Sequence, residues 1–457
     1  MSNLHYVWED DPGAPPMAHT PILRDVQPSQ SSLSFDVKDG RVNQHGDKHM
    51  ELRYWSAVDS AYRTADWAHR QGICAWHKKH GSTLPLDLDA GEQFNARYER
   101  EYGVEFFHGN VQDRIIYSCE SPDMVSHELG HAILDGLNPS LYPPPNSEVN
   151  AFHEAFGDIS SMLSLLALPS FCDSVLHETG GELEVSSRLS RVAEQMAWAV
   201  RRRRTGSVET HCLRDAANEF YYKSPDLLPP RGPVTELCRE EHSFSRIFSA
   251  SFLEILSVIF GQYGTDALAL GKAADHAAKL LVLAARNTPV SKRYFADIAA
   301  CMLVVDAGRF EGEHGGSLRK IFNRRGIYPL SESQALDRVR LDAAVEKLEF
   351  PPFSEKKEGE SSLRIPGERY GLTSSFTVVP PCGRPWLVEQ NCEADDEEGI
   401  NLEEAVSFVD ALFSQDKVGV CKGIRKDTCP ESDPRGHTHE IQEVPEGFVL
   451  RRVRFQC

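Results

Sequence analysis

Residues 121–158 read SPDMVSHELGHAILDGLNPSLYPPPNSEVNAFHEAFGD. The beginning of this stretch has the marks of a helix start, because Ser121-Pro122-Asp123 supplies an N-cap, a proline at the first helical position and an acid in the first turn. Asp135-Gly136 is typical of a helix end. The stretch therefore predicts a helix over residues 122–135 and a second, strongly apolar helix over residues 148–167.

Two histidines of the first predicted helix form a candidate metal site. His127 and His131 are four residues apart and therefore lie on one face of the helix. Two imidazoles in this arrangement can bind one Zn²⁺, and Glu128 can accept a proton from a water that the metal activates. The motif alone is a weak signal, since it arises by chance in roughly one chain of this length in fifteen or twenty.

The second predicted helix strengthens the signal. A catalytic zinc site needs a third protein ligand and an open position for water, and Glu154 can be that ligand. Asp158, one turn further on, can accept the remaining N–H of a ligating histidine and so orient its ring. Because their helix is otherwise apolar, these two carboxylates favour a site over a solvated acidic face.

Composition narrows the class of protein. The 457 residues include 49 Lys and Arg against 68 Asp and Glu, a net charge of −19, which disfavours nucleic acid and anionic membranes as partners. We find no run of 18 apolar residues, and we expect no membrane span and no signal peptide. The 11 cysteines are odd in number and scattered, so we expect mostly buried thiols and a cytoplasmic location.

Changes in pattern along the chain predict its organisation. We expect an extended lead-in over residues 1–50, a main domain over 51–328 and a small α+β appendix over 329–457. The main domain has two strand-like segments between residues 102 and 117. Beyond the first two helices, helical periodicity marks the ranges 187–203, 243–262, 266–286, 291–308 and 315–324. In the appendix, residues 376–380 and 448–455 are strand-like, and a helix is expected over 401–414.

The segment around the two predicted helices resembles the active site of the thermolysin family of zinc endopeptidases, which are gluzincins (HExxH plus Glu). His127–His131 matches the family's zinc helix, and Glu154-Ala155-Phe156-Gly157-Asp158 matches its second motif. The similarity covers about residues 50–328. It implies a two-lobed α+β domain, with a sheet-rich N-terminal lobe, a helical C-terminal lobe and the zinc helix between them. A strand near Val104–His108 is expected at the cleft edge, where an extended peptide pairs.

Further positions gain a role from the resemblance. Tyr142 and His242 match the family's two donors to the tetrahedral oxyanion, and Arg214 matches the arginine that binds a substrate carbonyl. By position, Met124 and Leu213 line the pocket for the residue after the scissile bond. The resemblance thus implies a metalloprotease, a hydrolase of peptide or protein substrates, with one catalytic Zn²⁺ and a preference for large apolar residues after the cut.

The chain departs from the family pattern at several positions. His153 replaces an asparagine, and we expect it at the surface. Leu237 falls where the family has the acid that orients the catalytic histidine. Three nearby glutamates can substitute for that acid, namely Glu236, Glu240 and Glu241.

Calcium is not expected. Asp123 has a counterpart among the family's calcium ligands, but Leu165 and its apolar neighbours fall where a bridging acid would be. We therefore expect no double calcium site.

Two other functions stay open. A zinc aminopeptidase shares the His-Glu-x-x-His site but typically has a Gly-x-Met-Glu-Asn segment, which we do not find. A non-catalytic zinc protein with an acidic, partner-binding appendix is the second. His437-Thr438-His439 is expected at the surface rather than on a metal. If the enzyme is latent, we expect residues 329–457, rather than the N-terminus, to inhibit it. The oligomeric state stays open.

Overall fold

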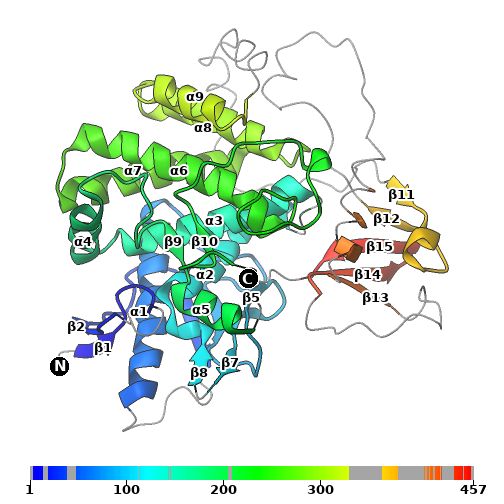
Figure 1. The fold of residues 1–457 in the computed structure, drawn as a ribbon, viewed down its shortest axis with the longest axis horizontal. Coiled ribbons are helices and arrows are strands. Elements are labelled where there is room, and N and C mark those ends of the chain that lie inside the picture. The colour runs from blue at the N-terminus through cyan, green and yellow to red at the C-terminus, as the bar shows by residue number, and fades with distance from the viewer. Residues whose placement is uncertain are drawn as a thin grey trace.

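The computed structural model describes residues 4–13, 19–38, 48–112, 114–142, 144, 146–203, 208–328, 363–378, 406, 409–410, 412–414, 417–421, 424, 437–445 and 447–453. The fold is α+β, as expected. In Figure 1 helix α1 and the hairpin β7–β8 lie toward the bottom of the larger body, helices α6–α9 lie toward its top, and α2 and α3 lie between them. A small sheet, β11–β15, lies to one side.

The first part of the chain contributes most of the strands. The antiparallel pair β1 (Leu4–Val7) and β2 (Ile22–Asp25) packs on helix α1 (Lys48–Arg70). A four-stranded sheet has the order β3-β4-β6-β5 and contains β3 (Ser34–Lys38), β4 (Thr83–Asp87), β5 (Ala96–Glu99) and β6 (Gly103–Phe106). Since β3 belongs to the lead-in and β4 to the main domain, the packing is continuous across residue 50.

The strand expected at the cleft edge is not an edge. β6 lies between β4 and β5 and is hydrogen-bonded on both sides. β7 (His108–Val111) pairs with β8 (Arg114–Tyr117), and His108 also forms a bridge with Glu92. The expectation was wrong because a sequence shows that a segment is extended but does not show which neighbours cover its two edges.

Helices dominate residues 122–324. They are α2 (Pro122–Leu137), α3 (Ser147–Leu165), α4 (Pro169–Thr179), α5 (Glu194–Arg203), α6 (Glu241–Tyr263), α7 (Ala267–Asn287), α8 (Tyr294–Arg309) and α9 (Gly315–Arg324). Helix α4 was not predicted. The helix expected from residue 187 begins only at Glu194, because β9 (Arg191–Val192) pairs there with β10 (Arg214–Asp215).

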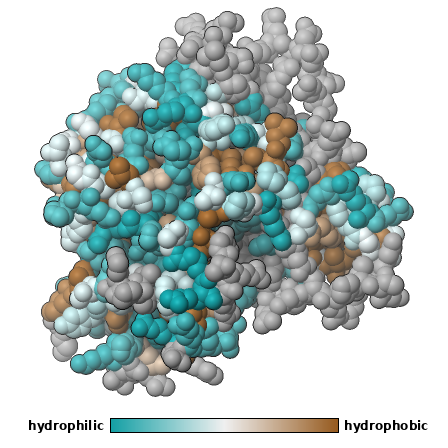
Figure 2. Space-filling model, in the orientation of Figure 1, coloured by the Kyte–Doolittle hydropathy of each residue, from teal (hydrophilic) through white to brown (hydrophobic). Residues whose placement is uncertain are grey.

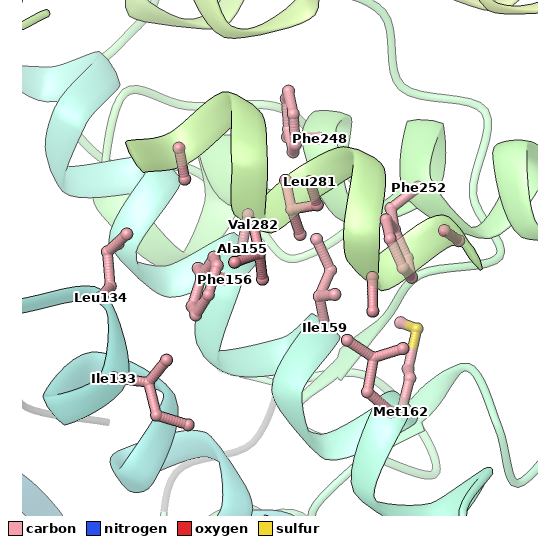
Figure 3. Packing of buried hydrophobic residues seen from close by; sticks show 14 of the residues in the cluster. Ile133, Leu134, Ala155, Phe156, Ile159, Met162, Phe248, Phe252, Leu281 and Val282 are labelled. Atoms are coloured by element: carbon pink, nitrogen blue, oxygen red, sulfur yellow. The ribbon is translucent and has the colours of Figure 1, made fainter. Parts of the chain in front are cut away.

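The two helices of the candidate site approach each other unusually closely. A Cβ added to Gly130 of α2 would lie 2.9 Å from the Cα of Gly157 on α3, and a Cβ on Gly157 would lie 2.6 Å from the His127 ring. Only glycine permits this approach without displacement of the neighbour. Figure 3 shows the apolar side chains that hold α2 and α3 against α6 and α7, including Leu134, Phe156 and Phe248.

Helix α6 is the most apolar long helix of this core. By length and composition it is a candidate membrane span, but 83% of its most apolar window is buried inside the protein. That degree of burial is typical of the core helix of a folded domain. The face of the molecule in Figure 2 is largely hydrophilic, with apolar side chains in small groups. Among the cysteines of the described residues, five are buried free thiols, as expected: Cys119, Cys172, Cys212, Cys238 and Cys301.

The lead-in carries a buried carboxyl into the main domain. Asp11 accepts hydrogen bonds from the backbone N–H groups of Gly13 and Gln195, both at 2.8 Å. Asp123 at the start of α2 is also buried and accepts from Ala193 N–H at 3.2 Å. Burial raises the pKa of Asp11 to about 6, despite these hydrogen bonds. Burial and the nearby Asp11 raise the pKa of Asp123 as well.

The raised pKa of Asp11 predicts that the stability of the folded protein depends on pH. Because the folded protein binds the Asp11 proton more tightly than the unfolded chain, stability falls as the pH rises from 3.8 to about 6. Asp11→Asn keeps the acceptor and removes the charge. We expect it to raise the Tm at pH 7.5 by about 2–4 °C and to change the Tm at pH 4 much less. The exposed Asp36→Asn is the control, and an equal Tm change for Asp11→Asn at both pH values would contradict the argument.

The appendix has its own sheet and its own core. The five strands have the order β11-β12-β15-β14-β13 and are β11 (Leu363–Ile365), β12 (Phe376–Val378), β13 (Val418–Val420), β14 (His439–Val444) and β15 (Gly447–Arg452). Its buried apolar residues, such as Phe376, Leu412 and Ile441, form a cluster separate from that of the main domain. The helix expected over 401–414 lies largely outside the described residues.

Candidate metal centre

Three side chains from α2 and α3 converge at the centre of the larger body. His127 Nε2 lies 3.4 Å from Glu154 Oε2, and His131 Nε2 lies 3.7 Å from Glu154 Oε1. All three side chains are fully buried. Two imidazole nitrogens facing one carboxylate across such distances form a donor set that could bind a metal ion.

Glu128 lies beside this set. Ligand atoms of His127, Glu128 and His131 all lie within 4.8 Å of one another, and Glu128 is fully buried. This cluster could bind a metal ion. These distances bring the Glu128 carboxylate close to both histidines, while Glu154 faces their Nε2 atoms.

A buried ion-pair network orients His127. Its Nδ1 lies 3.0 Å from Asp158 Oδ1, and Arg214 on β10 donates to the same oxygen through Nη2 at 2.7 Å. Burial alone would raise the pKa of Asp158, but Arg214 and the hydrogen bond from His127 lower it to about 2. Asp158 thus remains an anion that fixes the His127 ring with Nε2 toward Glu154. This is the arrangement expected for Asp158.

The carboxylates favour positive charge at this position. Burial would lower the pKa of His127, yet its contacts with Asp158 and Glu154 raise it to about 9. Burial would raise the pKa of Glu154, but the surrounding histidines, with His242 as the largest contributor, lower it. The same carboxylates, Asp158 and Glu154, attract a bound cation as they attract these protons.

His242 lies on the other side of Glu154. Its Nε2 is 3.3 Å from Glu154 Oε2, and its Nδ1 is hydrogen-bonded to Glu240 Oε1. Glu240 is also the N-cap of α6, accepting from the N–H of Ser243 at 2.9 Å. Burial would lower the pKa of His242, but Glu240 and Glu154 raise it to about 8. Among the three candidate glutamates, Glu240 is therefore the one that orients His242.

The sequence contained only a faint signal for this choice. Glutamate is not among the preferred N-cap residues, so Glu240 could not be distinguished from its neighbours by capping rules. The residue at which α6 begins had to be known before Glu240 could be recognised as its N-cap.

Tyr142 is held from several sides. Arg100 stacks on its ring, 4.2 Å from the ring centroid, and donates to its carbonyl oxygen at 3.2 Å. Arg100 is itself paired with the buried Asp135, which also accepts from the Tyr98 hydroxyl. The Tyr142 hydroxyl donates to the backbone carbonyl of Val453 at 2.7 Å. The sequence predicted a role for Tyr142 as an oxyanion donor. It predicted neither the contacts with Arg100 nor the hydrogen bond to Val453.

The chain matches no protein-family model, and no curated protein is similar to it in sequence. Assignment of the site therefore depends on its own residues and geometry.

Two expectations about histidines were wrong. His153 is fully buried rather than exposed, and its Nε2 lies 3.1 Å from the carbonyl oxygen of Leu141, next to Tyr142. His437 and His439 are 5% and 1% exposed, so they are not surface residues. Histidine is often exposed, and the sequence pattern around these positions did not show that they are buried.

The two predicted pocket residues differ in exposure. Met124 is buried in the first turn of α2, while Leu213 is half-buried and precedes Arg214, with its N–H donating to Val192. Their role in a substrate pocket stays a prediction.

Proposed function

We propose that this protein is a zinc-dependent endopeptidase with one catalytic Zn²⁺ held by His127, His131 and Glu154. The observation that carries the proposal is the convergence of these three buried side chains around one position, with Glu128 beside them. A catalytic zinc site has three protein ligands, whereas structural sites have four, often cysteines.

The surrounding residues suit peptide hydrolysis. Zinc, when bound, supplies a Lewis acid that lowers the pKa of water and polarises a carbonyl. Glu128 accepts the proton of the attacking water and then delivers it to the leaving amine. His242, oriented by Glu240, and Tyr142 donate hydrogen bonds to the oxyanion.

Arg214 and the pocket residues account for substrate binding in this proposal. Arg214 uses its planar guanidinium both to hold Asp158 and to bind a substrate carbonyl. Met124 and Leu213 form the apolar pocket for the residue after the cut. Eight of the strands, β1–β8, lie before residue 118, and the helices α2–α9 lie between residues 122 and 324, a distribution that supports the two-lobed thermolysin-like arrangement that the sequence resembles.

A mixed peptide library tests the proposal directly. We expect the zinc-loaded chain to cut internal bonds on the N-terminal side of large apolar residues, as read by mass spectrometry of the products. Glu128→Gln serves as the inactive control. Removal of only the N-terminal residue would indicate an aminopeptidase instead, and a preference for charged residues after the cut would exclude the assignment of Met124 and Leu213.

A further inference from the structure

The described part of residues 363–453, here called the C-terminal unit, contacts the candidate active site. The hydroxyl of Tyr142 donates a 2.7 Å hydrogen bond to the carbonyl oxygen of Val453, which is 311 positions further along the chain. A backbone carbonyl is also the group that a peptide substrate would present to this hydroxyl. Val453 thus accepts the hydrogen bond that the Tyr142 hydroxyl would donate to the oxyanion in the proposed reaction.

Val453 is held in place by the rest of its unit. Its N–H donates to the carbonyl of Thr438 at 2.9 Å, and the N–H groups of Thr438 and His439 donate to Lys417 O at 2.9 and 3.0 Å. Thr438 is fully buried, and His437 and His439 are almost so. These hydrogen bonds connect Val453 to the residues that directly precede β13 and β14.

A charged side chain of the same unit acts on the other oxyanion donor. Burial would raise the pKa of Glu240, but His242 and, to a smaller extent, the positive charge of Lys417 lower it to about 2. Glu240 is the residue that orients His242. The unit therefore contacts Tyr142 directly, and its Lys417 attracts Glu240 electrostatically.

Both proposed oxyanion donors are largely buried in the structure. Tyr142 is 8% exposed, and the His242 side chain is 17% exposed, although both must contact a substrate in the proposed reaction. In the described residues the unit has a hydrophobic core separate from that of the larger body. It can therefore separate from Tyr142 without disrupting either core.

We propose that residues 363–453 form an internal inhibitor that binds the substrate face of the candidate active site and keeps the full-length chain latent. The inference rests on the proposed endopeptidase function for its consequence, but the docking itself is independent of activity. The group that occupies this face is a backbone carbonyl of the chain itself, and a peptide substrate competes with it.

Lys417→Glu tests the regulatory consequence in the zinc-loaded full-length protein. The substitution reverses the attraction to Glu240 and leaves every proposed catalytic and zinc-binding residue intact. We expect kcat/KM for a library-derived peptide to rise about tenfold. Arg364→Glu makes the same change of charge at an exposed position of β11 in the same unit and should leave kcat/KM unchanged.

A second measurement tests the docking without relying on activity. A specific protease site inserted between residues 359 and 360 allows the folded chain to be cut, and sedimentation velocity then gives the Kd between the two parts. Tyr142→Phe removes one hydrogen bond and should weaken this association about fivefold. Cutting followed by dilution below the Kd should also raise kcat/KM.

The outcomes separate the two proposals. Equal kcat/KM for intact, cut and Lys417→Glu proteins would overturn the latency and leave the endopeptidase assignment standing. Equal association for wild type and Tyr142→Phe would overturn the docking. Absence of cleavage by every form, with association weakened by Tyr142→Phe, would support the docking and remove the endopeptidase assignment.

Discussion

Glu128→Gln is expected to lower kcat/KM for an internal peptide bond by about 10²–10⁴-fold while one zinc ion per chain remains bound. Glutamine has nearly the same volume and fits the same fully buried position. It cannot accept the proton of the attacking water, so the loss falls on the chemical step. His127, His131 and Glu154 are unchanged, so metal binding should persist.

The measurement combines peptide hydrolysis with the zinc content of the same samples. Glu313→Gln, which neutralises an acid that is 62% exposed, is the matched control and should have wild-type kcat/KM. Retention of more than about a tenth of wild-type activity by zinc-loaded Glu128→Gln would show that another group is the base. If the zinc content fell in parallel with activity, Glu128 would be acting as a ligand instead.

Glu154→Gln is expected to lose the bound zinc. Glu128→Gln, in contrast, should keep its zinc and lose only the rate of the chemical step. Glu154 faces the Nε2 atoms of both His127 and His131, so its charge is central to the donor set. Loss of an outer partner of a metal ligand costs about 10–100-fold in affinity, and loss of the ligand itself should cost more. Stoichiometry after dialysis should fall from one zinc per chain to well below one.

Thermal unfolding gives a second readout for this variant that does not depend on activity. A ligand that binds only the folded protein stabilises it by about 2.7 kcal/mol at a hundredfold excess over its Kd. We therefore expect zinc to raise the Tm of the wild type and of Glu128→Gln, but to have little effect on Glu154→Gln. An equal zinc-induced increase in all three proteins would place the metal elsewhere.

The contrast between these two variants separates metal binding from proton transfer. Glu128 and Glu154 are both fully buried glutamates of the same site, so their substitutions are closely matched in chemistry and burial. Only their predicted roles differ. A shared phenotype would therefore count against the assignment of one base and one ligand.

Much of the candidate site was predictable because its rules are local. The pairs His127–His131 and Glu154–Asp158 are each four residues apart on a helix, which fixes a common face without knowledge of the fold. Ser121 caps α2 as expected, accepting from the N–H of Met124. The boundaries of α2 and α3 agree with the predicted ones within a few residues.

The tertiary structure alone decided what depends on distant neighbours. It buried His153 against Leu141, made β6 an interior strand and brought Val453 to Tyr142. Each of these outcomes depends on which elements pack together, because burial and edge pairing are properties of a neighbourhood in space. By itself the sequence determined which helix faces carry the metal-binding groups, since helical periodicity repeats every few residues. The packing of elements far apart in the chain decided what covers those groups.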